Sequence, residues 1–321
     1  MNKINIKKYK CFDSLKVESL KRVNLIGGKN NVGKTAFMEA CYIATSQNTQ
    51  QLYMRILEVE VHRDFINHLR SFSSKRETIE KLIKENVDIA ISTDLQKILI
   101  KQNQNRFEVL PSQGSPMPDG FMYENLVSLL DLSFQDVKFP FSPNFITAIS
   151  DDNKLYNTII SQLKFHYKYD TFNTYIKQMY GIDKIDTISD QPHFSSNNKW
   201  SKLSHYGQGI KTFVNVLGSI LCLKDEAVFI DEIENGIHYS LLDQFWEMIL
   251  RVSKEQNVQL FATTHSKECI ESYARVSEKS EEKEISFINL SQNKKKSIVA
   301  IILDSEMFQS EIEQNHEVRA W

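Results

Sequence analysis

The sequence contains few of the residues that mark several common classes of protein. Its 321 residues include only 4 cysteines, and none form a C-x-x-C pair, which argues against a disulfide framework or a zinc site. No apolar run approaches the roughly 18 residues of a membrane-spanning helix. The basic start MNKINIKKYKCF is not followed by the apolar segment of a secretory signal. We therefore expect a cytoplasmic protein with no membrane association.

Neither sign of charge is in excess, since the formal net charge is -2. Binding to a phosphate backbone would therefore need local basic clusters. Two clusters are present, one at Lys7, Lys8 and Lys10 and one at Lys294–Lys296. Solvated lysines on an edge strand and in a hairpin turn are the stronger interpretation of both. Nucleic acid stays open as a partner.

Apolar segments with strand and helix periodicity alternate along both ends of the chain. This alternation predicts an α/β fold, with a mixed sheet flanked by helices. The predicted strands are 4–6, 23–26, 227–230 and 258–262, with further strands or a hairpin within 87–110; the predicted helices follow residue 35 and cover 50–86, 155–180, 208–223 and 239–253.

The alternation is clearest at the two ends, so we predict one discontinuous core made of residues 1–49 and 200–321. Residues 50–199 would form an inserted lobe of helices and short strands. Within the lobe, residues 111–150 contain five of the 6 prolines and are expected to be irregular.

Glycine is scarce, with 10 residues, so a glycine-rich loop between a strand and a helix is informative. Residues 28–35, GKNNVGKT, match the phosphate-loop pattern G-x-x-x-x-G-K-[ST]. Backbone N–H groups of such a loop and of the following helix bind phosphates. A glycine-rich turn without a ligand is the weaker alternative. The predicted nucleotide-binding residues are Gly28, Lys29, Asn30, Asn31, Val32, Gly33, Lys34, Thr35 and Ala36.

Two carboxylates follow the apolar strand 227–230. At the carboxyl end of a central strand, Asp231 would share a crevice with the phosphate loop. We predict that Asp231 and the Thr35 hydroxyl hold Mg²⁺, that Glu232 is the general base, and that Lys34 contacts the β- and γ-phosphates of ATP. A strand capped by solvated acids is the alternative.

The strand 258–262 ends in the same way, in Thr263, Thr264 and His265. A neutral imidazole beside the γ-phosphate could hydrogen-bond to it, and we predict a catalytic role for His265. Together with Cys269 it would supply two ligands, too few for zinc.

The order of these motifs resembles the ABC class of ATPases. Between the loop and the acidic pair lies LSHYGQG, residues 203–209. Within the class, the chain resembles the OLD, RecF and SMC-head branch, in particular stand-alone bacterial "AAA family ATPase" proteins with an OLD-like ATPase domain. Three segments carry the resemblance: YKCFDSLKVESLKRVNLIGGKNNVGKTAFMEA, DEIENGIHYSLLDQFWEMI and the closing NHEVRAW. The resemblance covers roughly 1–45 and 200–321.

The resemblance implies a homodimer in which each ATP lies between one subunit's phosphate loop and the other subunit's signature segment. Ser204, His205, Gly207 and Gly209 would form that segment, although HYGQG departs from both L-S-G-G-Q and S-x-G-x-G. A glycine-rich helix cap is the alternative. Residues 234–236 and His238 would form the D-loop that reaches across the dimer. The family also has a Q-loop glutamine. Several glutamines lie within 47–51 and one is Gln135, and none of them stands out as that residue.

Septu and PARIS defence ATPases are similar in layout, which implies a separate effector protein and a role on DNA or in antiphage defence. An ATP-gated scaffold that assembles an effector with negligible turnover is the alternative. A nuclease is not expected, because only residues 266–321 follow His265 and no HNH-like cluster is present. The sequence contains no N-K-x-D motif, which would favour GTP, so ATP is the expected nucleotide.

Overall fold

The computed structural model describes residues 1–46, 51, 55, 58–59, 89–94, 97–100, 145–146 and 153–313. Contacts divide the chain into two compact units, one of residues 1–19, 39–140 and 292–300 and one of residues 20–38, 141–291 and 301–321. This division reflects which residues pack against one another. The boundaries at residues 49 and 199 concern the order of segments along the chain, and they stay a prediction.

The first unit contains a four-stranded antiparallel sheet in the order β2-β1-β4-β5. Its strands are β1 (Ile4–Tyr9), β2 (Phe12–Val17), β4 (Ile89–Thr93) and β5 (Lys97–Ile100). The predicted strand at 4–6 and the hairpin within 87–110 are therefore confirmed. The strand β2 was not predicted, because its sequence FDSLKV alternates only partly between polar and apolar residues.

The second unit is built on a six-stranded sheet in the order β13-β12-β3-β11-β10-β6. All five strands from β12 to β6 run parallel. Residues of β3 are buried throughout, as expected for a parallel strand covered on both faces. The strands are β3 (Val23–Gly28), β6 (Phe145–Ile146), β10 (Ala227–Ile230), β11 (Gln259–Thr263), β12 (Ile285–Gln292) and β13 (Ile298–Asp304).

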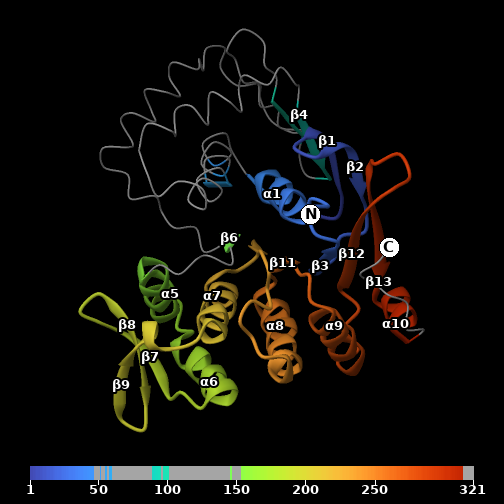
Figure 1. Ribbon diagram of the computed structural model, residues 1–321. Coiled ribbons are helices and arrows are strands. Elements are labelled where there is room, and N and C mark those ends of the chain that lie inside the picture. Colours follow the sequence, from blue (N-terminus) through green and yellow to red (C-terminus); the bar gives the residue numbers. More distant parts are fainter. Residues whose placement is uncertain are drawn as a thin grey trace, which may run out of the picture. The chain divides into compact units, whose positions relative to one another are not determined.

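Helices of the second unit lie side by side along this sheet (Figure 1). The Tyr273 hydroxyl on α9 donates to the Val23 carbonyl of β3 at 3.0 Å, and its ring lies 4.6 Å from that of Trp246 on α8. Both aromatic side chains are buried, so they join the two helices to the sheet. The helices are α7 (Gln208–Cys222), α8 (Leu242–Gln256), α9 (Lys267–Lys279) and α10 (Ser305–Glu313).

Residues 153–202 form two helices and a small sheet. The helical region predicted over 155–180 is confirmed, but it consists of two helices. The first, α5 (Asn153–Phe165), ends before Tyr167, whose φ is 57°, and the second, α6 (Tyr169–Tyr180), begins after it. The three-stranded sheet β7-β8-β9 was not predicted. Its strands are β7 (Lys184–Ile188), β8 (Gln191–Ser196) and β9 (Lys199–Lys202).

Some predictions fall outside the described residues. They are most of the helix over 50–86, most of the irregular segment 111–150, Gln135 and the closing NHEVRAW. In the part of the chain that the structure describes, no helix is both long enough and apolar enough to cross a bilayer.

Candidate functional site

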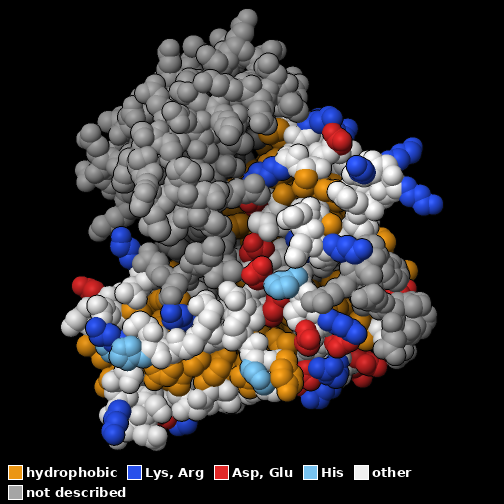
Figure 2. All heavy atoms as spheres, viewed as in Figure 1, with side chains coloured by type: hydrophobic (Ala, Val, Ile, Leu, Met, Phe, Trp, Pro, Cys, Tyr) orange, Lys and Arg blue, Asp and Glu red, His pale blue; other side chains and the backbone are white. Residues whose placement is uncertain are grey.

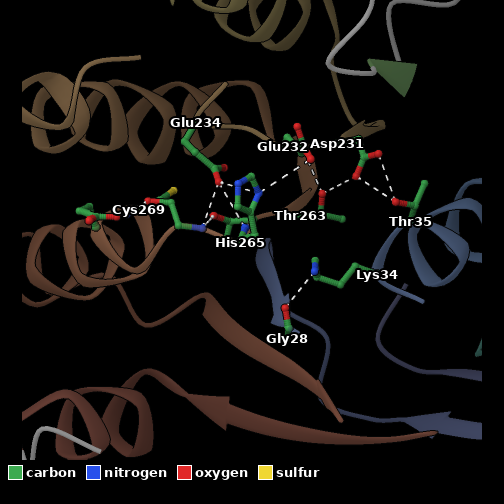
Figure 3. Close-up of polar contacts among 12 residues, drawn as sticks. Gly28, Lys34, Thr35, Asp231, Glu232, Glu234, Thr263, His265 and Cys269 are labelled. Carbon is green, nitrogen blue, oxygen red and sulfur yellow. Dashed lines mark hydrogen bonds and ion pairs between the residues drawn. The ribbon is translucent and has the colours of Figure 1, made fainter. Parts of the chain in front are cut away.

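Three loops meet at the carboxyl edge of the six-stranded sheet. The adjacent parallel strands β3, β11 and β10 are in register, with Thr263 opposite Ile26 and Ile230 opposite Ala262. Residues that follow parallel strands emerge at the same edge. This register places the loop after β3, the acidic pair after β10 and His265 after β11 in one neighbourhood (Figure 3).

The loop after β3 has a backbone shape that requires its glycines. Gly28 has a φ of 137° and Gly33 a φ of 90°, both in the region that favours glycine. A Cβ atom at position 28 would also lie 2.3 Å from the Leu290 carbonyl oxygen. The helix α1 (Lys34–Ala44) starts directly after the loop. The predicted strand, loop and helix are confirmed, with the helix N-terminus at the loop.

The side chains around the loop differ in their access to a ligand. Lys29, Asn30 and Asn31 are exposed, whereas Val32 and Ala36 are buried. A nucleotide would therefore meet the last two only through their backbone N–H groups.

Lys34 lies over the loop that precedes it. Its ammonium Nζ donates to the carbonyl oxygens of Gly28 at 2.9 Å and Lys29 at 3.1 Å. The positive charge is thus held at the loop, where phosphate oxygens could replace neutral carbonyls as its acceptors.

The Thr35 hydroxyl and the Asp231 carboxylate are adjacent. Thr35 Oγ1 lies 3.3 Å from Asp231 Oδ1 and 3.2 Å from Oδ2. Hydroxyl and carboxylate oxygens are ligands that Mg²⁺ accepts, and this ion commonly keeps several waters and substrate phosphates in its shell. No group of three or more His, Cys, Asp or Glu suited to a metal occurs among the described residues, so a fully protein-made cage is not found there. The pair fits Mg²⁺ bound together with a nucleotide.

Thr263 connects the two acidic residues. Its hydroxyl donates to Asp231 Oδ1 and accepts from the backbone N–H of Glu232 at 2.9 Å. The sequence predicted that the Thr263 hydroxyl lies at the end of a strand, but it did not predict the hydrogen bonds to Asp231 and Glu232.

Glu232 has a left-handed backbone, with a φ of 54°. This conformation costs a non-glycine residue about 1–3 kcal/mol and is often found at functional sites. Two hydrogen bonds hold this conformation: the Glu232 N–H donates to the Thr263 hydroxyl, and the Asn235 N–H donates to the Glu232 carbonyl at 2.9 Å. The Glu232 side chain is 47% exposed, so its carboxylate is open to solvent at the site.

His265 lies between two glutamates. Its Nδ1 is 3.8 Å from Glu232 Oε1 and 3.6 Å from Glu234 Oε1, and its side chain is 53% exposed (Figure 3). The Cys269 thiol is buried, which raises its pKa. Burial therefore disfavours the thiolate, the form of cysteine that binds a metal.

The Glu234 side chain turns toward its own subunit, while the D-loop role of residues 234–236 and His238 stays a prediction. The Glu234 side chain is only 10% exposed. The carboxylate oxygen Oε1 accepts from the backbone N–H groups of His265 and Ser266, both at 3.2 Å. Sequence reasoning missed this contact, because a D-loop position gives no sign of where its side chain turns.

The proposed signature residues form a second group at the start of α7. Ser204, His205 and Gly207 are exposed, while Gly209 is buried against the segment that follows the acidic pair. A Cβ atom on Gly209 would lie 2.3 Å from the Gly236 carbonyl oxygen. Three of the four residues are therefore accessible at the surface, and Gly209 is held by its packing against Gly236.

The two glycines of this group allow a matched test of that packing. Gly209→Ala should destabilise the fold by about 1–3 kcal/mol, because the clash is with backbone. Gly207→Ala should cost less than this, because nothing lies within 4 Å of a Cβ there and only the preference for glycine over alanine at the N-cap of α7 is lost. Denaturant midpoints of the two variants check this, and equal midpoints would contradict the close packing.

Acidic side chains and a histidine gather at the middle of the face shown in Figure 2, near the end of β11 in Figure 1. The basic clusters are elsewhere in the chain. Lys8 pairs with Asp13 at 2.6 Å and Lys10 with Glu39 at 2.7 Å. Lys294–Lys296 are exposed in the turn between β12 and β13. The second cluster thus lies in a hairpin turn, as predicted. The edge strand expected for the first cluster is wrong, because β1 pairs with both β2 and β4.

Comparisons with known proteins show which proteins this chain is similar to. A family model described as "AAA domain, putative AbiEii toxin, Type IV TA system" matches residues 123–271, which include the acidic pair and His265. The chain is also similar to a protein of Helicobacter pylori (strain ATCC 700392 / 26695) named ATP/GTP phosphatase. The two are 22% identical over 319 residues, which cover 84% of this chain and 86% of the relative.

Two solved structures of SMC heads match this chain. The SMC head domain from Thermotoga maritima matches with a TM-score of 0.48 and 14% identity, over 94% of this chain and 98% of that one. An SMC head bound to the C-winged helix domain of ScpA matches with a TM-score of 0.53 and 11% identity, over 95% and 98%. With the sheet order, the second likeness shows an α/β P-loop NTPase fold, and the family match supports an ABC-like P-loop ATPase.

Proposed function

We propose that this chain binds and hydrolyses ATP as a switch in which two copies close over two nucleotides. The observation that carries the proposal is the contact of Thr35 with Asp231 beside a phosphate loop of the required backbone shape. The name of the Helicobacter pylori relative, ATP/GTP phosphatase, supports hydrolysis of a nucleoside triphosphate.

Each residue of the site has a distinct part in the proposed reaction. Backbone N–H groups of residues 28–36 and the Lys34 ammonium bind the phosphates. Thr35 and Asp231 would hold Mg²⁺, which supplies neutralising charge on the phosphate oxygens. Glu232 orients a water and takes its proton as the water oxygen attacks the γ-phosphorus. The bond from this phosphorus to the oxygen that bridges it to the β-phosphate then breaks, and ADP and phosphate leave. His265 would donate a hydrogen bond to the γ-phosphate.

The exposed signature group supports the dimer. Ser204, His205 and Gly207 lie on the surface at the N-terminus of α7, where hydroxyl and N–H groups favour an anion. A second copy that brings its γ-phosphate to this group would be held by charge-assisted hydrogen bonds. Loss of that phosphate on hydrolysis would release the copies.

The output of the switch is proposed to be a separate effector protein, in DNA-related work or antiphage defence. One SMC head structure is bound to a domain of another protein, ScpA, which supports a protein partner for this fold. The layout shared with Septu and PARIS ATPases favours defence.

The basic test is phosphate release under multiple turnover, measured in parallel with ATP and GTP. We expect steady release and an ATP-dependent shift from monomer to dimer in analytical ultracentrifugation. Nucleotide-dependent assembly without turnover would instead favour the scaffold, and no binding of either nucleotide would remove the proposal.

Mixed dimers provide a sharper test of the shared site. We expect little hydrolysis from the Lys34→Ala homodimer and from the Ser204→Ala/His205→Ala homodimer. Mixing the two should restore hydrolysis, because one of the two sites then has an intact phosphate loop and an intact signature group. As a control, a subunit with all three changes mixed with wild type leaves no intact site. Failure of the first mixture to recover activity would show that the signature group does not act in trans.

A further inference from the structure

The two carboxylate oxygens of Glu234 differ in their contacts. Oε1 accepts from the His265 and Ser266 N–H groups, both at 3.2 Å. Oε2 is buried and makes no hydrogen bond with any residue that the structure describes. Buried polar atoms without a partner are uncommon and call for an explanation. The proposed roles of the acidic pair and of His265 do not account for this side chain.

The location of Glu234 favours a negative charge. Ser266 is the N-cap of α9, and its hydroxyl accepts from the Cys269 N–H at 3.1 Å. Partial positive charge at a helix N-terminus stabilises an adjacent carboxylate. The two N–H groups that Glu234 accepts from belong to the loop that carries the imidazole of His265. The contact therefore determines the backbone position from which that ring projects.

The segment after Glu234 is fixed on its other side. The Thr212 hydroxyl on α7 donates to the Asn235 carbonyl at 2.8 Å. Gly236, with a φ of 72°, packs against the backbone of Gly209, and the Tyr180 hydroxyl donates to the Gly209 carbonyl at 3.2 Å. Glu234 thus links a segment held by α7 to the loop of His265.

We propose that Glu234 is a positioning residue that fastens the His265 loop to the segment after the acidic pair, so that hydrolysis depends on it through His265. This inference rests on the proposed ATPase function. It assigns Glu234 a contact within its own subunit. The imidazole of His265 then stays beside Glu232, since its Nδ1 lies within 4 Å of both carboxylates.

A double-mutant cycle on kcat tests the dependence. We expect Glu234→Ala to lower kcat about 10- to 100-fold with little change in ATP affinity, because a small displacement of a reacting group has effects of this size. In a His265→Ala background the same change should have no further effect. Glu234→Gln, which retains an oxygen acceptor for both N–H groups, should keep most of the activity. Equal loss in both backgrounds, or a Gln variant as slow as the Ala variant, would overturn the proposal.

Hydrogen exchange gives a readout that needs no catalysis. Glu234→Ala should speed exchange at the His265 and Ser266 amides, while Glu234→Gln should retain protection there. If wild type fails to hydrolyse ATP, the ATPase proposal is wrong, and the exchange rates still decide whether Glu234 holds the loop. Unchanged exchange in the Ala variant would overturn the contact. Should that variant fail to fold, exchange at the two amides of the Gln variant decides.

Discussion

Glu232→Gln should bind ATP, hydrolyse it about 10²- to 10⁴-fold more slowly than wild type, and accumulate as a dimer. General-base catalysis contributes about that factor, and a neutral amide cannot take the proton of the attacking water. Glutamine has nearly the same shape, and the group of Glu232 that donates to the Thr263 hydroxyl is its backbone N–H, which the substitution leaves unchanged. The nucleotide should therefore stay bound with its γ-phosphate in place, which favours the closed dimer.

Single-turnover hydrolysis and sedimentation with ATP measure the two effects. Glu226→Gln is a matched control, because Glu226 is an exposed glutamate directly before β10, at the end of the strand opposite Glu232. This variant should hydrolyse ATP at the wild-type rate. If Glu232→Gln remains monomeric with saturating ATP at every protein concentration, the two-copy mechanism is wrong.

The sequence predicted the parts of the site that are written as short contiguous patterns. The phosphate loop needs a glycine at each turn, so the chemistry of residues 28–35 is visible without any tertiary contact. The strands β10 and β11 are apolar runs that end in polar residues, and the parallel register then brings Asp231 close to Thr35. In these cases local pattern and fold topology give the same answer.

Contacts between residues distant in sequence could not be predicted in this way. Glu234 meets the loop of His265, 31 residues further along, and nothing in the D-loop sequence indicates this partner. The fit of Gly209 against Gly236 is similar, since each glycine alone suggests only a turn or a cap. The sequence located these residues, but their roles depend on the packing of α7 against the segment after β10.

Positive φ angles at residues other than glycine were a second feature that the sequence did not predict. Tyr167 and Glu232 both have positive φ, a region that tyrosine and glutamate rarely adopt. Tyr167 therefore carried no signal for the break between α5 and α6. At Glu232 the same conformation coincides with the proposed catalytic carboxylate, as expected where surrounding hydrogen bonds sustain local strain.

Lys34→Ala should weaken ATP binding about 100-fold or more and abolish hydrolysis. A hydrogen bond to a charged group contributes about 1.5–3 kcal/mol, and Lys34 would make such bonds to two phosphates. In the structure the Lys34 ammonium already lies at the loop, on the carbonyls of Gly28 and Lys29. The phosphates would then replace acceptors that are neutral, so the change to alanine removes charge from the centre of the site.

Titration with a fluorescent ATP analogue measures the affinity. The control variant Lys29→Ala distinguishes the effect of the position of the Lys34 ammonium from the effect of losing one positive charge. Lys29 is exposed on the same loop, so its loss removes an equal charge at a solvated position. Solvent and salt screen such a charge, and we expect only a several-fold effect on Kd. Equal losses in the two variants would mean that the loop attracts ATP by net charge alone. Tight binding by Lys34→Ala would remove the phosphate-loop assignment, because the Lys34 ammonium is the charge that lies on the carbonyl oxygens of that loop.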